Sequence, residues 1–156
     1  MRGLYFLLIV AVIGVGVWYN WQRKDTTLYD FFVGDDVVMS IDGVKFAVEV
    51  ASTSEARTLG LSGRDDLGGV LGLLMVFNEP GYHGIWMKDM RFSIDVIWIS
   101  EDLRVIDITR RLLPESYPRI YEPAKPAKYV LETKPDLVDA YGISVGDEVT
   151  LPAGVE

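Results

Sequence analysis

Apolar positions form one long uninterrupted run at the start of the chain and a series of short runs after it. Residues 4–17 are apolar or glycine throughout, and no charge occurs between Gly3 and Gln22. About 20 helical residues at about 1.5 Å each span roughly 30 Å, which matches the hydrocarbon core of a bilayer. The pattern therefore predicts a transmembrane helix within residues 1–24.

The residues on either side of this run favour a helix that stays in the membrane. Interfacial aromatic residues and then cations follow it, and one cation precedes it: Trp18, Tyr19, Trp21, Arg23, Lys24 and, before the run, Arg2. No pair of small residues of the A-x-A kind offers a cleavage site. We expect an uncleaved signal-anchor spanning residues 4–21, with a cleaved signal peptide as the alternative, and an extracytoplasmic C-terminal domain.

After an acidic linker at 25–36, the short apolar runs have the length and period of β-strands. Asp42-Gly43 separates two alternating runs, a strong signal for a hairpin because both positions accept positive φ. Residues 70–77 are wholly apolar, and 92–99 carry apolar side chains on both faces, so both runs predict buried strands. Further strands are expected at 103–112, 128–133 and 146–151, with a turn-rich stretch at 78–84 and a long proline-rich loop at 114–128.

Two short segments have helical signals instead. Ser52 with Glu55 three residues later predicts a capped helix that ends near Gly60, and Pro135 begins a second one. About seven strands with two short helices indicate a mainly β domain over residues 37–152. We expect a small antiparallel barrel or sandwich.

The stretch GIWMKDMRFSIDVIWIS at 84–100 places charges between two apolar runs. A turn at 89–91 would bring Lys88 and Asp95 together across neighbouring strands, beside Trp86. Such a cluster can be an anion or sugar contact, or an ion pair that fixes strand register. Both interpretations remain open from the sequence.

Three further charged residues are candidates for a site. Arg57 and Arg64 can offer planar forks to a carboxylate or phosphate. Glu132 lies in the apolar strand KYVLET, where an acid must be paired, exposed at an edge or functional. Together with Asp95 it would supply the two carboxylates of a glycosidase.

Composition limits the chemistry. The chain has no cysteine and a single histidine, His83, so thiolate chemistry and histidine-rich metal sites are excluded. Met75, Met87 and Met90 are better interpreted as core-filling than as soft-metal ligands. We expect no metal and no cofactor. Beyond residue 24 there are 12 cations and 23 acids, which opposes binding to nucleic acid.

The motifs together resemble the DUF192 family (domain of unknown function 192). They are E-x-x-x-x-x-E-A-R-x-x-G-L-S-G-R, L-G-L-L-M-V-F, I-W-M-K-D-M followed by S-I-D-V-I, Y-V-L-E, and G-I-S-V-G-D-E-V, within about residues 37–151. The resemblance implies a small mainly β domain, often behind a signal sequence or anchor, with no assigned activity. Its recurrent polar positions fall on Arg57, Arg64, Lys88, Asp95, Glu132 and Asp147.

Three hypotheses follow. The leading one is a membrane-anchored domain that binds a small anionic or saccharide-like ligand, or serves as an accessory envelope module. Its candidate ligand-binding residues are Arg57, Arg64, Trp86, Lys88, Asp95 and Glu132. The alternatives are an envelope-polymer hydrolase that uses Asp95 and Glu132, and a purely structural or protein-interaction domain.

Overall fold

The computed structural model describes residues 37–155, which fold into a mainly β domain. The helix predicted within 1–24 and the linker at 25–36 lie outside the described residues. Across 37–155, no helix combines the length and the apolar character that a membrane crossing requires.

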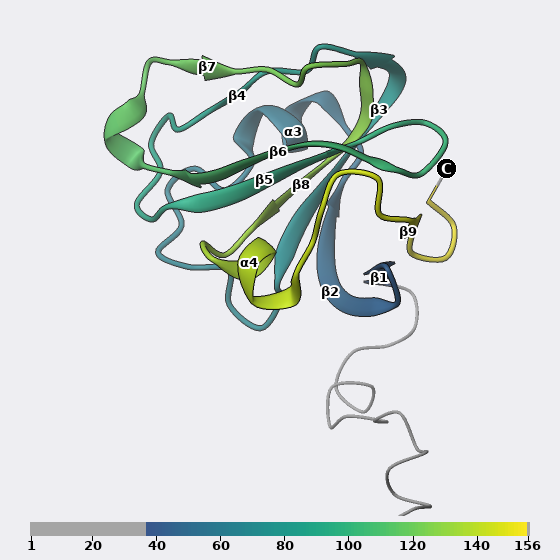
Figure 1. Cartoon of the computed structure of the whole chain (residues 1–156). Coiled ribbons are helices and arrows are strands. Elements are labelled where there is room, and N and C mark those ends of the chain that lie inside the picture. The colour runs from purple at the N-terminus through teal and green to yellow at the C-terminus, as the bar shows by residue number, and fades with distance from the viewer. Residues whose placement is uncertain (1–36, 156) are drawn as a thin grey trace, which may run out of the picture. The chain divides into compact units, whose positions relative to one another are not determined.

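The described residues form nine strands, two short α-helices and a 3₁₀ turn at Pro114–Ser116 (Figure 1). Their bounds are β1 Val38–Ile41, β2 Val44–Ala51, α3 Ser54–Leu59, β3 Gly72–Gly81, β4 Ile85–Trp86, β5 Ile94–Ile99, β6 Val105–Leu112, β7 Ile120–Tyr121, β8 Ala127–Thr133, α4 Leu137–Tyr141 and β9 Val149–Thr150. The mainly β class with two short helices agrees with the prediction from sequence.

Seven strands form one curved, half-barrel sheet, in the order β6-β5-β8-β3-β2-β1-β9. An antiparallel bridge between Arg104 and Glu148 links the β6 and β9 ends of the sheet. The strands β4 and β7 form a separate two-stranded sheet. The expectation of an antiparallel sheet is wrong at one place, because β2 and β3 run parallel. The connection between these two strands contains α3 and leads back to the end of the sheet at which β2 begins, so that β3 can run in the same direction.

The hairpin between β1 and β2 has the predicted turn. Asp42 and Gly43 take φ of 47° and 79°, and Ile41 pairs with Val44 across the turn. Both turn residues lie in the left-handed region, where aspartate and glycine are tolerated better than other residues. This part of the fold depends on local chemistry alone.

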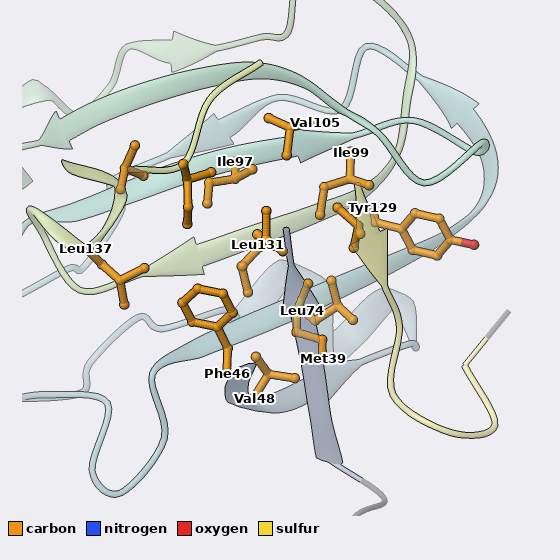
Figure 2. Packing of buried hydrophobic residues seen from close by; sticks show 14 residues of the cluster. Met39, Phe46, Val48, Leu74, Ile97, Ile99, Val105, Tyr129, Leu131 and Leu137 are labelled. Carbon is orange, nitrogen blue, oxygen red and sulfur yellow. The ribbon is translucent and has the colours of Figure 1, made fainter. Parts of the chain in front are cut away.

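The sheet separates two hydrophobic clusters. On its inner face, Phe46, Leu74, Ile97 and Leu131 belong to a buried cluster that Leu137 of α4 joins (Figure 2). On its outer face, a second cluster contains residues of the sheet and of the segments that cover it, among them Leu61, Met75, Ile85, Val96, Trp98 and Val130. Because neighbouring residues of a strand point to opposite faces, each central strand contributes to both clusters.

Three local predictions need correction. The N-cap of α3 is Thr53, whose Oγ1 accepts from the Ala56 amide at 3.1 Å, and not Ser52. The strand β3 continues to Gly81, through residues expected to form a turn. The proline-rich segment expected to be a loop contains β7, which pairs with β4. This last pairing joins residues about 35 positions apart in the chain, so no local sequence pattern predicts it.

Candidate functional site

Glu132 is the buried carboxyl of the outer layer. On β8, Leu131 belongs to the inner cluster and Val130 to the outer one, so the strand alternation turns Glu132 toward the outer layer. The residue is 4% exposed, and its Oε2 has no hydrogen-bond partner. Burial raises the pKa of this carboxyl to about 7, while the positive charge of Arg64 opposes the shift. Glu132 is thus able to hold or release a proton near neutral pH.

Gly60 leaves the space above this carboxyl open. Its φ of +52° favours glycine, and a Cβ at this position would lie 3.7 Å from Glu132 Oε2. The same Cβ would be 3.3 Å from the Met75 methyl group. The backbone after α3 therefore passes directly over Glu132 and Met75, at a residue without a side chain.

A pocket of about 290 Å³ opens beside these residues, between α3 with its following turn and β4. Figure 1 shows α3 and β4 in the same region of the domain, and residues of both elements line the pocket. Apolar side chains line much of it, with hydroxyl groups near the α3 side. We call it the Glu132 pocket; its lining is Ser54, Arg57, Thr58, Leu59, Gly60, Leu61, Ser62, Met75, Phe77, Gly84, Ile85, Trp86, Met90 and Glu132.

Arg57 lies in the wall of the pocket and fixes α3 to the sheet. Its Nη1 donates to the carbonyl oxygens of Ser52 and Val76, each at 2.7 Å. Its guanidinium lies 4.8 Å from the centre of the Phe77 ring, whose plane also stacks on His83 at 3.6 Å. This end of the guanidinium is therefore engaged with the protein itself.

Arg64 is paired with another acid. It forms a bidentate salt bridge with Glu49, in which both N–O distances are 2.9 Å. The hydrogen bonds and the charge of Arg64 hold the pKa of Glu49 below its ordinary value. Arg64 is not in the pocket lining, yet its charge still acts on Glu132.

Trp86 and Lys88 lie at the mouth of the pocket. The Trp86 side chain is 42% exposed, and the Lys88 Nζ lies 5.7 Å from the centre of its ring. The ring of Tyr117 meets Trp86 edge-on at 6.1 Å. The predicted meeting of Lys88 with Asp95 is wrong, because β4 pairs with β7 and not with β5.

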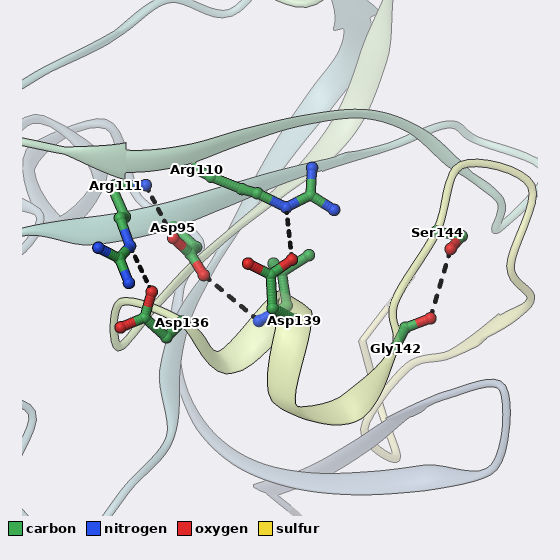
Figure 3. A network of polar contacts seen from close by, with 8 residues as sticks. Asp95, Arg110, Arg111, Asp136, Asp139, Gly142 and Ser144 are labelled. Atoms are coloured by element: carbon green, nitrogen blue, oxygen red, sulfur yellow. Dashed lines mark hydrogen bonds and ion pairs between the residues drawn. The ribbon is translucent and has the colours of Figure 1, made fainter.

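Asp95 faces the opposite side of the sheet. It is fully buried; its Oδ1 accepts from the Arg111 amide at 2.8 Å and its Oδ2 from the Val138 amide at 3.3 Å (Figure 3). One oxygen therefore binds the neighbouring strand β6, and the other fastens α4 to the sheet. Ion pairs of Arg110 with Asp139 and of Arg111 with Asp136 reinforce the same junction. Asp95 belongs to this network and not to the pocket.

The structure places three of the six predicted site residues in the pocket lining and two near it, and separates Asp95 from them. Arg57, Trp86 and Glu132 line the pocket, Lys88 lies at its mouth, and Arg64 acts on Glu132 by its charge. Asp147, the further family position, accepts from the Ser144 amide at 2.8 Å in the turn before β9.

Sequence reasoning missed several pocket residues. Met75, Phe77 and Met90 have no polar group to single them out, and their apolar runs look like core. Gly60 had a signal, since it was expected to end the helix, but nothing local indicated that a carboxyl lies beneath it. In the part of the chain that the structure describes, no three histidine, cysteine or carboxylate side chains converge to form a metal site.

Comparison with known proteins agrees with the resemblance seen in the sequence. The model of the DUF192 family, described as an uncharacterized ACR, matches residues 37–151. A UPF0127 protein of Pyrococcus abyssi is 35% identical over 105 residues, which are 65% of this chain and 83% of the relative. A UPF0127 protein of Pyrococcus furiosus is 36% identical over 67 residues, 43% of this chain, and the match spans about half (52%) of that relative.

Two crystal structures have a similar fold. A protein of unknown function from Novosphingobium aromaticivorans superposes with a TM-score of 0.68 at 29% identity, covering 72% of this chain and 83% of its own. A Sinorhizobium meliloti protein, provisionally named a transcription regulator, superposes with a TM-score of 0.65 at 29% identity, covering 69% and 83%.

Proposed function

The chain belongs to the DUF192 family, and we propose that its β domain is a binding module whose Glu132 pocket takes a saccharide-like, hydroxyl-bearing ligand. The observation that carries this proposal is the unpartnered Oε2 of Glu132, buried next to a pocket. A buried polar atom without a partner costs about 1–3 kcal/mol, so proteins seldom retain one without a use. A ligand hydroxyl that donates to this oxygen would supply the missing hydrogen bond.

The surroundings of Glu132 favour a neutral ligand over an anionic one. A carboxyl beside the pocket repels an anion whenever it is ionised. The two arginines that an anion would need are engaged, Arg57 with backbone carbonyls and Arg64 with Glu49. Of the two ligand classes expected from the sequence, the saccharide-like class therefore has the stronger support.

Trp86 adds a reason to choose sugars. Its indole is partly exposed at the mouth of the pocket, and an aromatic face combines apolar contact area with a polar edge. Ser54, Thr58 and Ser62 line the same space. The hydroxyls of Ser54 and Thr58 can both donate and accept, whereas that of Ser62 donates to the Lys88 carbonyl oxygen and can only accept from a ligand. An apolar ring face and several hydroxyls are the groups that a sugar presents in return.

We also propose that the N-terminal segment anchors this module in a membrane with the domain outside the cytoplasm. The support is the sequence pattern: an uncharged stretch of about 20 residues followed by interfacial aromatics and cations. A reporter fused at the C-terminus tests the orientation, and reporter activity characteristic of the cytoplasm would contradict it.

The positions of Asp95 and Glu132 do not support the hydrolase hypothesis. Asp95 pairs with Thr133 and Val96 with Glu132, so the two proposed carboxylates point to opposite faces of one sheet. They cannot flank one glycosidic bond. A nucleic-acid role is not proposed either, because the chain beyond residue 24 carries 12 cations against 23 acids.

A binding assay on the full chain tests the proposal. The protein is kept in lipid nanodiscs, because maltoside detergents would themselves present sugars, and its Tm is measured with a panel of monosaccharides. A ligand at about 100 times its Kd adds about 2.7 kcal/mol, which corresponds to several degrees of Tm.

The variants decide whether such a shift comes from the pocket. Glu132→Ala should abolish it, and the exposed Glu101→Gln should leave it unchanged. Glu132→Gln, which keeps the shape of the side chain, guards against a folding defect in the alanine variant and should weaken binding. No shift across the panel, or an equal shift in Glu132→Ala, contradicts the proposal.

A further inference from the structure

The Glu132 pocket continues into a second hollow that the proposed function does not use. This outer groove, of about 500 Å³, is lined by Ser54, Glu55, Thr58, Leu59, Ser62, Trp86, Lys88 and Asp89. Five of these residues, Ser54, Thr58, Leu59, Ser62 and Trp86, also line the Glu132 pocket. The two hollows therefore form one continuous path that leads from Glu132 outward along α3.

Two large apolar side chains lie at the junction of the two hollows, next to the hydroxyl-bearing residues. Leu59 is 61% exposed and Trp86 is 42% exposed, and both side chains line the inner and the outer hollow. Apolar side chains that line a pocket and remain exposed offer contact area to a ligand bound there.

Hydrogen bonds hold the far wall of the outer groove in place. Ser62 Oγ donates to the Lys88 carbonyl oxygen at 2.8 Å, and the Gly63 amide donates to the Asp89 carbonyl oxygen at 2.8 Å. One step further along, Arg91 forms a salt bridge of 2.7 Å with Asp65. The loop after β4 is thus fixed to the turn after α3, so the groove exists before any ligand arrives and binding loses little entropy there.

The outer groove offers both kinds of polar partner. Lys88 supplies an ammonium donor, whereas Glu55 and Asp89 supply carboxylate acceptors, and all three side chains are exposed. A hydroxyl-rich ring can use donors and acceptors together, while a simple cation would meet the like charge of Lys88 and a simple anion the like charges of Glu55 and Asp89. The inner pocket, at about 290 Å³, lies at the small end of ligand pockets and suits a single ring.

We propose that the ligand is a chain of at least two sugar units, with one unit in the Glu132 pocket and the next in the outer groove beside Trp86 and Lys88. This inference rests on the proposed function and names its ligand class more closely. The first unit is recognised by Glu132 and the second by the exposed polar groups of the groove. Affinity then rises with the second unit and gains little from a third, which extends past the lined surface.

Calorimetric titration of the full chain in nanodiscs tests this chain-length dependence. The probes are glucose, cellobiose and cellotriose, and in parallel N-acetylglucosamine with its dimer and trimer. In the series that binds, the disaccharide should bind at least tenfold more tightly than the monosaccharide, and the trisaccharide within about threefold of the disaccharide.

Two variants separate the subsites. Lys88→Ala should weaken disaccharide binding at least threefold more than it weakens monosaccharide binding, whereas Glu132→Ala should remove both. The exposed Lys125→Ala, outside both hollows, is the matched control and should bind like the native protein.

The possible outcomes distinguish the two proposals. Equal affinity for mono- and disaccharide, lost in Glu132→Ala, overturns the chain-length inference and leaves the proposed function standing. Binding of neither series, while a short lysine-containing peptide such as Gly-Lys-Gly binds in a Glu132-dependent way, overturns both and identifies the groove as a peptide site. Binding of no probe at all also overturns both.

Discussion

Asp95 and Glu132 lie on neighbouring strands of one sheet and point to opposite faces of it. The register of β5 and β8 places Asp95 opposite Thr133 and Val96 opposite Glu132. Asp95 therefore accepts two backbone hydrogen bonds beneath α4, while Glu132 meets a pocket with one oxygen unpartnered. Two buried acids of similar sequence context thus have different roles, one in holding the fold and one in the candidate site.

Glu132 should make the stability of the protein depend on pH. Its folded pKa of about 7 exceeds its ordinary value of 4.5, so between these values the folded state holds more protons than the unfolded chain. The free energy of unfolding therefore falls as pH rises from 4.5 to above 7, by at most about 3 kcal/mol from this residue. Denaturant titrations at several pH values give the free energy of unfolding of the native protein and of Glu132→Gln. As pH rises through this range, the free energy of unfolding of the native protein should fall relative to that of the variant. Parallel curves would contradict the burial-driven shift.

Replacing Arg64 should move the titration of Glu132 further upward. The positive charge of Arg64 favours the ionised carboxylate, so Arg64→Gln should raise the pKa of Glu132, by less than burial itself does. Carbon-detected NMR of the glutamate side-chain carboxyls measures this pKa. The control is Arg91→Gln, whose partner Asp65 is exposed; a shift of the same size there would mean that net charge and not Arg64 is responsible.

Asp95→Asn should loosen α4 without disturbing the pocket. In the native protein each carboxylate oxygen accepts from one backbone N–H. Asparagine has only one side-chain oxygen, so its NH₂ group would face the other N–H and that hydrogen bond would be lost, at a cost of about 1–3 kcal/mol. Hydrogen exchange should quicken in residues 134–143 and in β6 more than in β3. The exposed Asp102→Asn is the control. Retained protection of α4 at native stability would refute the role assigned to Asp95.

Gly60→Ala should reduce both stability and ligand binding. Its backbone conformation is strained for alanine by about 1–3 kcal/mol, and the new methyl group would crowd Met75 and approach Glu132 Oε2. Gly63→Ala is a matched control, because Gly63 also has positive φ (+74°) but has no atom within 4 Å of the added Cβ. Both variants should lose stability in thermal unfolding, and Gly60→Ala alone should lose affinity for a sugar that binds the native protein. Equal affinity in the two variants would argue against a site beneath Gly60.

Local patterns were sufficient for much of the fold. The Asp42-Gly43 turn, the buried strand at 94–99 and the helix that ends at Gly60 follow from backbone preferences and alternation within a few residues. The DUF192 resemblance, confirmed over residues 37–151, drew on the same short motifs. Local reasoning failed where similar signals compete, as with Ser52 and Thr53 for the N-cap of α3.

The sequence by itself determined the mainly β class and the family. It also singled out the charged residues of the candidate site, because charges inside apolar runs are visible without coordinates. Only the tertiary structure decided which of those charges share a surface. Strand pairing across β5, β8 and the distant β4 and β7 sets which side chains meet, and a one-residue change of register reverses the face of every side chain in a strand. For this reason the sequence of residues 84–100 drew attention to Lys88 and Asp95 but could not indicate where each lies. The tertiary structure places Lys88 at the pocket mouth and Asp95 beneath α4.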